Sequence, residues 1–350
     1  MNSESMTAGS MSADTIHVSA PGKLFLLGEY AVLEGAPALL TAVDRRAHVH
    51  ATVIDGPAWQ ISAPNLGIHD LVLGAHGKLP AELDPAMVAH LKVFDAVRAL
   101  VQARATAALP ALCLHIDTRD FAADGYKLGL GSSAAVAAAL TAALTTAAGM
   151  TLARAELAAW AIAAHRAAQN GTGSGGDVAV SVYGGVISYV RDTPPVSLAW
   201  PERLIGRAVV TGQGASTPDL VGRVYAYGER DAAGFARDIQ RLATLADSAA
   251  AAVDDTPAFL DLATQYFSAL KTLDAHAAAG IVSPRHDTLA ALAETHGGRF
   301  KSSGAGGGDV GLLFADRSIM RARLFEAFHE AGADVLDLGF AAPGLIHEPR

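Results

Sequence analysis

The feature that most constrains this chain is a glycine turn at residues 127–135, KLGLGSSAA, which opens directly into an alanine-rich run. Glycine lets backbone amides approach an anion without interference from a side chain. The first turn of a helix has unpaired amides and the positive end of the helix dipole. Together they predict a phosphate site at a helix start, made by Gly129, Leu130, Gly131, Ser132, Ser133 and Ala134. The pattern is neither GxxxxGK[ST] nor GxGxxG, so it indicates a nucleotide site of another kind.

Composition excludes several classes of protein. A chain of 350 residues with 51% hydrophobic and 17% charged residues is typical of a soluble enzyme with two domains. The net charge of −9 argues against nonspecific nucleic-acid binding. Cys113 is the only cysteine, so we expect no internal disulfide and a reducing, cytoplasmic location. The apolar run at residues 134–150 is too short and too rich in alanine to span a membrane, so it predicts a buried helix and no membrane partner.

Hydrophobic periodicity predicts strands and helices in both halves of the chain, without regular alternation. This mixture predicts an α+β fold. Residues 21–23 (PGK) are expected to form a turn between two short strands, and residues 192–195 (DTPP) are expected to divide the chain. We therefore expect a disordered tail at residues 1–14, an N-terminal domain at residues 15–192 that holds the predicted phosphate site, and a C-terminal domain at residues 195–350.

Three glycine-bearing segments stand far apart in the sequence: APGKLFLLGEY at residues 20–30, the turn at residues 129–135, and SGAGGGD at residues 303–309. In this order and spacing, the set resembles the GHMP kinase superfamily over nearly the whole chain. The resemblance implies a two-lobed α+β fold, with an N-terminal lobe like ribosomal protein S5 and a ferredoxin-like C-terminal lobe. It implies an active site between the lobes, with ATP and Mg²⁺ as cofactors.

The resemblance assigns roles to individual residues. Lys23 would meet the transferred phosphoryl group, and Asp177 corresponds to the catalytic Asp of the family. Ser132 or Ser133 would offer a hydroxyl to Mg²⁺ or to a phosphate oxygen. A purely structural role stays open at two of these positions, because Ser and Asp are favoured at helix N-caps and Ser132 and Asp177 could each cap a helix.

Substrate-binding candidates share cationic or polar character, or adjoin one of the three motifs. They are Lys127, Ser303, Gly304, Ala305, Gly306, Glu29, Tyr30 and His165, with Arg45, Arg46 and Lys301 as further cations. Lys127 is favoured because it adjoins the phosphate loop and a phosphorylated substrate needs cationic partners. Glu29 could instead cap backbone amides. His165 and Arg166 could face the substrate or lie on the surface of their helix.

Finer details resemble the phosphomevalonate kinases within this superfamily. Tyr30 stands where mevalonate kinases usually have His, and residues 164–169 (AHRAAQ) lack the Mg²⁺-binding Glu of those enzymes. The implied reaction is ATP-dependent phosphorylation of (R)-5-phosphomevalonate to 5-diphosphomevalonate, in the mevalonate route to isoprenoids. The alternatives are a mevalonate kinase or another small-alcohol kinase, or a ligand sensor without catalysis, against which Lys23 and Asp177 argue. The resemblance leaves a homodimer open.

Overall fold

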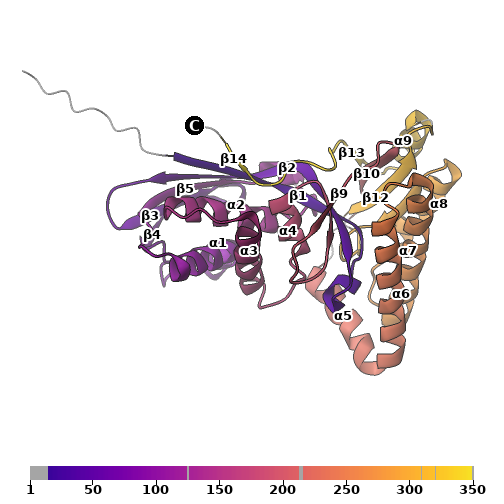
Figure 1. Cartoon of the computed structure of the whole chain (residues 1–350), viewed down its shortest axis with the longest axis horizontal. Helices are drawn as coiled ribbons and strands as arrows, with labels where there is room; N and C mark the ends of the chain where they lie inside the picture. Colours follow the sequence, from indigo (N-terminus) through magenta and orange to yellow (C-terminus); the bar gives the residue numbers. More distant parts are fainter. Residues whose placement is uncertain (1–14, 124–125, 213–215, 309, 320, 349–350) are drawn as a thin grey trace, which may run out of the picture.

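The computed structural model describes residues 15–123, 126–212, 216–308, 310–319 and 321–348. Within these residues, an eight-stranded sheet and a four-stranded sheet form the centres of two lobes (Figure 1). This mixture confirms the expected α+β class. The tail predicted at residues 1–14 lies outside the described residues, as does Asp309.

The first sheet has the strand order β14-β1-β2-β5-β3-β4, and β8 and β9 extend it beside β2. Neighbouring strands are antiparallel except for the parallel pair β3 and β5. The strands of this lobe are β1 (Thr15–Leu27), β2 (Ala38–Val53), β3 (Ala58–Ala63), β4 (Ile68–Ala75), β5 (Leu112–Asp117), β8 (Val186–Tyr189), β9 (Val196–Leu198) and β14 (Ile346–His347), with a separate ribbon of β6 (Ala122–Ala123) and β7 (Tyr126–Lys127).

Four helices cover one face of this sheet (Figure 1). They are α1 (Pro85–Arg104), α2 (Ser132–Ala147), α3 (Arg154–Ala168) and α4 (Gly176–Tyr183), and short 3₁₀ turns lie at η1 (Ala31–Glu34), η2 (Pro64–Leu66) and η3 (Arg119–Phe121). Helix α2 packs against β1, β2 and the other three helices. Its alanines let it approach all of them closely, and Thr141 and Thr145 donate their hydroxyls to carbonyls within the helix. This confirms the predicted buried helix, and none of the described helices is long and apolar enough to cross a membrane.

The second sheet has the order β11-β12-β10-β13 and is antiparallel throughout. Its strands are β10 (Leu204–Val210), β11 (Arg299–Ser302), β12 (Val310–Asp316) and β13 (Val335–Leu336). The helices of this lobe are α5 (Thr217–Arg230), α6 (Ala232–Ala251), α7 (Thr256–Ala277), α8 (Pro284–Thr295) and α9 (Arg321–Glu330). Strand β11 lies between α8 and the glycine-rich segment, so this sheet delivers that segment to the first lobe.

The turn expected at residues 21–23 is wrong. Strand β1 continues through these residues, and its pairing with β2 shifts register between Pro21 and Gly22. Pro21 is tolerated at this irregularity, where a strand can do without one ladder hydrogen bond. Gly22 is needed because a Cβ there would lie 2.8 Å from the carbonyl oxygen of Leu130. The irregularity therefore brings β1 against the predicted phosphate loop.

The C-terminal segment returns to the first lobe. Strand β14 pairs with β1, and the Arg46 guanidinium donates to the carbonyl oxygens of Pro343 (2.9 Å) and Gly344 (2.7 Å). Arg45 likewise donates to the carbonyl of Asp337. These two candidate substrate cations therefore hold the end of the chain. Because β9 and β14 both join the first sheet, the sheets do not follow the division into residues 15–192 and 195–350, which stays a prediction.

His286 links the start of α8 to Thr211, the residue after β10, and gives the fold an acid-sensitive contact. Its side chain is fully buried; Nδ1 accepts from the Ser283 amide (3.1 Å), and Nε2 lies 3.2 Å from the Thr211 hydroxyl. Burial lowers the pKa of His286 from 6.5 to about 4. The unfolded chain therefore takes up this proton near pH 6.5 and the folded chain only near pH 4. The stability contribution is fully present above pH 6.5 and is lost as the pH falls through that window.

We expect the free energy of unfolding to fall by about 2 kcal/mol more in the wild type than in His286→Gln between pH 7 and pH 5. Urea unfolding at the two pH values measures this difference. An equal fall in both proteins would contradict a neutral, buried His286.

Candidate active site

The predicted phosphate loop continues into the first turn of α2. Gly129 and Gly131 both have left-handed φ angles, 64° and 78°, which favour glycine. The amides of Ala134 and Ala135 donate to the Gly131 carbonyl, and helix geometry leaves those of Ser132 and Ser133 without an intrahelical acceptor. Gly131 is the N-cap residue, so the interpretation of Ser132 as the cap is wrong. The helix start is a site that can bind an anion on backbone amides.

Lys23 lies on this loop. Its amide donates to the carbonyl of Leu130 (2.8 Å), and a Cβ on Gly131 would lie 2.7 Å from Lys23 Cε. The side chain is half-buried, with Nζ 5.5 Å from the centre of the Phe25 ring. Because Gly131 has no side chain, the Lys23 side chain can lie along the start of α2. The structure brings together two segments that are about a hundred residues apart in the sequence.

The third glycine loop, defined here as residues 303–308, reaches the same strand from the other lobe. The Ser303 hydroxyl donates to the Phe25 carbonyl (2.9 Å), and the Tyr30 hydroxyl donates to the Ala305 carbonyl (2.6 Å). Gly306 has a φ of 82°, and a Cβ there would lie 2.3 Å from the carbonyl oxygen of Ile281. All three glycine segments thus meet around β1 between residues 22 and 25.

Asp177 lies in the first turn of α4, which packs against β1 and α2. The N-cap of α4 is Gly175, so the alternative interpretation of Asp177 as the helix cap is wrong. Its Oδ1 accepts from the Val178 amide at 2.9 Å, and the side chain is half-buried. The pairing of Asp177 with Lys23 stays a prediction.

Arg166 organises the loop that precedes Asp177. Its guanidinium donates to the carbonyls of Gly173 (3.1 Å) and Ser174 and pairs with Asp192 (2.6 Å). The Tyr189 hydroxyl donates to the same Ser174 carbonyl at 2.9 Å. Arg166 is thereby engaged with this loop, and the substrate-facing position considered for it is not the one that the structure shows.

His165 contacts the phosphate loop directly. It is buried, and its Nε2 lies 3.0 Å from the Ser133 hydroxyl and 3.2 Å from the side-chain amide of Gln169. Helix α3 therefore offers an imidazole to Ser133 within residues 164–169, the stretch that lacks a carboxylate. This contact makes His165 a support for Ser133, whereas the sequence suggested a direct contact with substrate.

We expect His165→Ala to raise the KM for ATP about 5- to 10-fold, because one hydrogen bond that orients Ser133 is lost. The kcat should change less, because Lys23 and the loop backbone are untouched. Initial rates over a range of ATP concentrations measure both constants, and His90→Ala, an exposed substitution on α1, is the control. An unchanged KM would show that Ser133 does not depend on His165.

Other predicted residues lie elsewhere than expected. Glu29 and Lys301 form a buried ion pair beneath the third glycine loop, and Tyr30 is buried beside them. Lys127 has its backbone in β7, and its side chain lies outside what the structure describes. Sequence reasoning missed the ion pair: Glu29 lies in an apolar run, which is a signal of burial, but nothing in the sequence around Lys301 connects it to Glu29.

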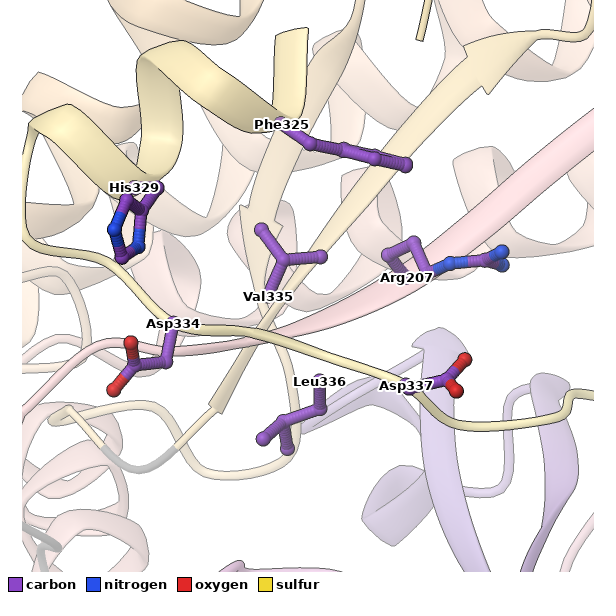
Figure 2. A pocket seen from close by; sticks show the side chains of 7 residues that line it. All are labelled: Arg207, Phe325, His329, Asp334, Val335, Leu336 and Asp337. Atoms are coloured by element: carbon purple, nitrogen blue, oxygen red, sulfur yellow. The ribbon is translucent and has the colours of Figure 1, made fainter. Parts of the chain in front are cut away.

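One surface hollow lies away from these loops. It has a volume of about 400 Å³ and is formed by β10, β13 and α9 (Figure 2). It is lined by Arg207, Phe325, His329, Asp334, Val335, Leu336 and Asp337. It shares no residue with the three glycine segments, so we assign it no part in their chemistry.

Comparison with known proteins identifies relatives over most of the chain. A family model described as the GHMP kinases N terminal domain matches residues 95–185. Phosphomevalonate kinase of Streptomyces sp. strain CL190 is 32% identical over 373 residues, covering 95% of this chain and 98% of that protein. Mevalonate kinase of Pyrococcus abyssi is 29% identical over 343 residues, covering 95% of this chain and 98% of that protein.

A solved structure has the same fold. Streptococcus pneumoniae phosphomevalonate kinase in complex with phosphomevalonate and AMPPNP is 19% identical and has a TM-score of 0.77. The match covers 93% of this chain and 99% of that chain. The likeness confirms the fold expected from the three motifs.

Proposed function

Because this chain belongs to the GHMP kinase family, we propose that it transfers the γ-phosphoryl group of ATP to (R)-5-phosphomevalonate. The products are 5-diphosphomevalonate and ADP. The observation that carries the proposal is the position of Lys23 along Gly131, at the start of α2. It puts a cation beside a backbone anion site, which is the arrangement that phosphoryl transfer requires.

The acceptor oxygen needs little activation in this reaction. The second pKa of a phosphate monoester is about 6, so the attacking oxygen is largely ionised at neutral pH. Catalysis then depends on in-line positioning and on neutralising the charge of the transferred group. In this scheme Lys23 neutralises that charge, and the amides of Ser132 and Ser133 hold the ATP phosphates. Asp177 orients Lys23 and the metal, and a strong base is not required.

Mg²⁺ fits this site through oxygen ligands. Among the described residues, no three His, Cys, Asp or Glu side chains lie where they could jointly hold a metal ion. The fitting ligands are the hydroxyls of Ser132 and Ser133, ATP phosphates and water, in agreement with the tendency of Mg²⁺ to retain waters. The contact of Ser133 with His165 would orient one of these hydroxyls. When bound, Mg²⁺ would withdraw charge from the ATP phosphates.

Substrate selection belongs to the residues around the third glycine loop and to Lys127. Ser303 lies against β1 near Lys23, and residues 303–305 are half-buried, so they can contact an acceptor. Tyr30 holds this loop through the Ala305 carbonyl, and Glu29 through its ion pair with Lys301. Lys127, just before the phosphate loop, is the proposed partner of the phosphate that the acceptor already carries.

A mevalonate kinase is the second candidate, favoured by the similarity to the Pyrococcus abyssi enzyme over 95% of the chain. The lack of a carboxylate at residues 164–169 and the presence of Tyr30 argue for the phosphorylated acceptor.

An ADP-release assay with phosphomevalonate, mevalonate, homoserine and galactose tests the proposal. We expect the kcat/KM for phosphomevalonate to exceed that for mevalonate at least about 100-fold, because cationic groups would be left unpaired by the unphosphorylated acceptor. Preference for mevalonate would overturn the assignment of the acceptor. Release of ADP with none of the four would overturn the proposed reaction.

A further inference from the structure

A buried ion pair joins the two lobes beneath the third glycine loop. Glu29, in the turn between β1 and η1, is 3% exposed, and Lys301, on β11, is 0% exposed. Lys301 Nζ lies 2.6 Å from Glu29 Oε1. The partners are 272 residues apart in the sequence, so this contact exists only when the lobes are docked.

Stability alone does not account for charges at this place. Burial raises the pKa of Glu29 and lowers that of Lys301, and in each case the partner's charge opposes the shift. A buried ion pair rarely stabilises a fold more than apolar side chains of similar size would, because both charges lose their hydration. Glu29 Oε2 is also buried without a hydrogen-bond partner among the described residues. A pair of this kind is better explained by the geometry that it imposes.

The contacts around the pair extend to both sides of the proposed site. Lys301 Nζ also donates to the carbonyl of Ser302, the residue that leads into the third glycine loop, and lies 5.7 Å from the centre of the Tyr266 ring. The Tyr266 hydroxyl donates to the Glu29 carbonyl at 2.9 Å. The next residue, Tyr30, has an unusual φ of 63°.

This backbone conformation is uncommon for a residue with a side chain. It aims the Tyr30 hydroxyl at the Ala305 carbonyl, at 2.6 Å. The turn after β1 is thereby connected to both the base and the middle of the third glycine loop.

We propose that Glu29 and Lys301 are positioning residues, whose ion pair sets the third glycine loop at a fixed distance from Lys23 on β1. Neither side chain reaches the reacting groups, because both are buried. The pair acts through the carbonyl of Ser302 and through the turn that ends the strand carrying Lys23. The effect on turnover rests on the proposed function, whereas the effect on the loop does not.

Turnover separates positioning from plain stability. We expect Glu29→Gln to lower kcat about 100-fold, the size of effect that a misplacement of about 1 Å can produce. The affinity for AMPPNP should stay within about 2-fold of the wild-type value, because the phosphate loop lies at the start of α2 and is not part of the third glycine loop. Glu29→Gln should also lower the melting temperature, because it leaves Lys301 buried without a charged partner. The double variant Glu29→Leu/Lys301→Met should restore the wild-type melting temperature, since an apolar pair loses no hydration, but it should not restore kcat.

Hydrogen exchange of a peptide spanning residues 303–308 gives a readout that does not depend on the acceptor. We expect faster exchange there in Glu29→Gln than in the wild type, and equal exchange in α6. Lys271→Met is the matched control, because Lys271 forms a 2.7 Å ion pair with Asp287 that is half exposed on the same lobe. The control should change neither kcat nor the exchange of the loop.

Wild-type kcat in the double variant, or unchanged exchange in Glu29→Gln, would overturn the proposal. If the double variant does not fold, turnover and exchange of Glu29→Gln still decide the question. If phosphomevalonate is not a substrate, the proposed function fails. Turnover is then measured with whichever acceptor supports ADP formation from ATP. The exchange result still shows whether the ion pair holds the third glycine loop.

Discussion

Lys23→Met is expected to lower turnover about 100- to 1,000-fold, the effect of removing one preorganised group that stabilises transition-state charge. Methionine keeps an unbranched apolar side chain as far as Cε, so its packing along Gly131 should be preserved. The melting temperature and the affinity for AMPPNP should therefore change little. ADP release at saturating ATP and phosphomevalonate measures the loss.

Lys92→Met is the control for this substitution, because Lys92 is exposed on α1. It should keep wild-type turnover. Turnover of Lys23→Met within about 3-fold of the wild type would mean that the ammonium does not act on the transferred group.

Gly131→Ala is expected to lower turnover about 100-fold through its effect on Lys23. The new Cβ would lie 2.7 Å from Lys23 Cε and 3.0 Å from Lys23 Cγ, so the side chain would be displaced from the helix start. The φ of 78° also disfavours alanine, at a cost in stability of about 1–2 kcal/mol. Urea unfolding and ADP release measure the two effects separately.

Gly149→Ala separates backbone strain from displacement of Lys23. Gly149 follows the other end of the same helix with a φ of 70°, and a Cβ there meets nothing within 4 Å. Both variants should lose similar stability, and only Gly131→Ala should lose turnover. If both lose turnover equally, the steric account of Gly131 is wrong.

Local sequence patterns predicted individual helices and strands better than they predicted how these elements pair with one another. The alanine run after Gly131 predicted a buried helix, and α2 is one, because small side chains with few polar groups suit close packing on all sides. A turn was expected at Pro21 and Gly22 because both residue types usually break strands. The expectation was wrong because the irregular pairing of β1 with β2 accommodates them. Such pairing depends on residues 43–46, which local patterns do not connect to this segment.

The site was predictable where a residue type carries its own chemistry. The glycines of the phosphate loop and Lys23 lie together as the motifs indicated, although their substrates and the role of Asp177 stay predictions. The environments of Glu29 and His165 were not predictable, because each depends on one partner from a distant segment. Lys301 comes from the other lobe, and Ser133 from the preceding helix. A carboxylate or imidazole in sequence does not show whether it faces solvent or a buried partner.

Phosphorus NMR of the reaction products tests the central claim most directly. The chain is incubated with ATP, Mg²⁺ and phosphomevalonate, with Lys23→Met in parallel. The account predicts that the phosphomonoester signal of the acceptor is replaced by two coupled diphosphate signals in step with ADP, and that the variant hardly reacts. An unchanged phosphomevalonate signal, together with a new phosphomonoester signal when mevalonate replaces phosphomevalonate in the incubation, would contradict it.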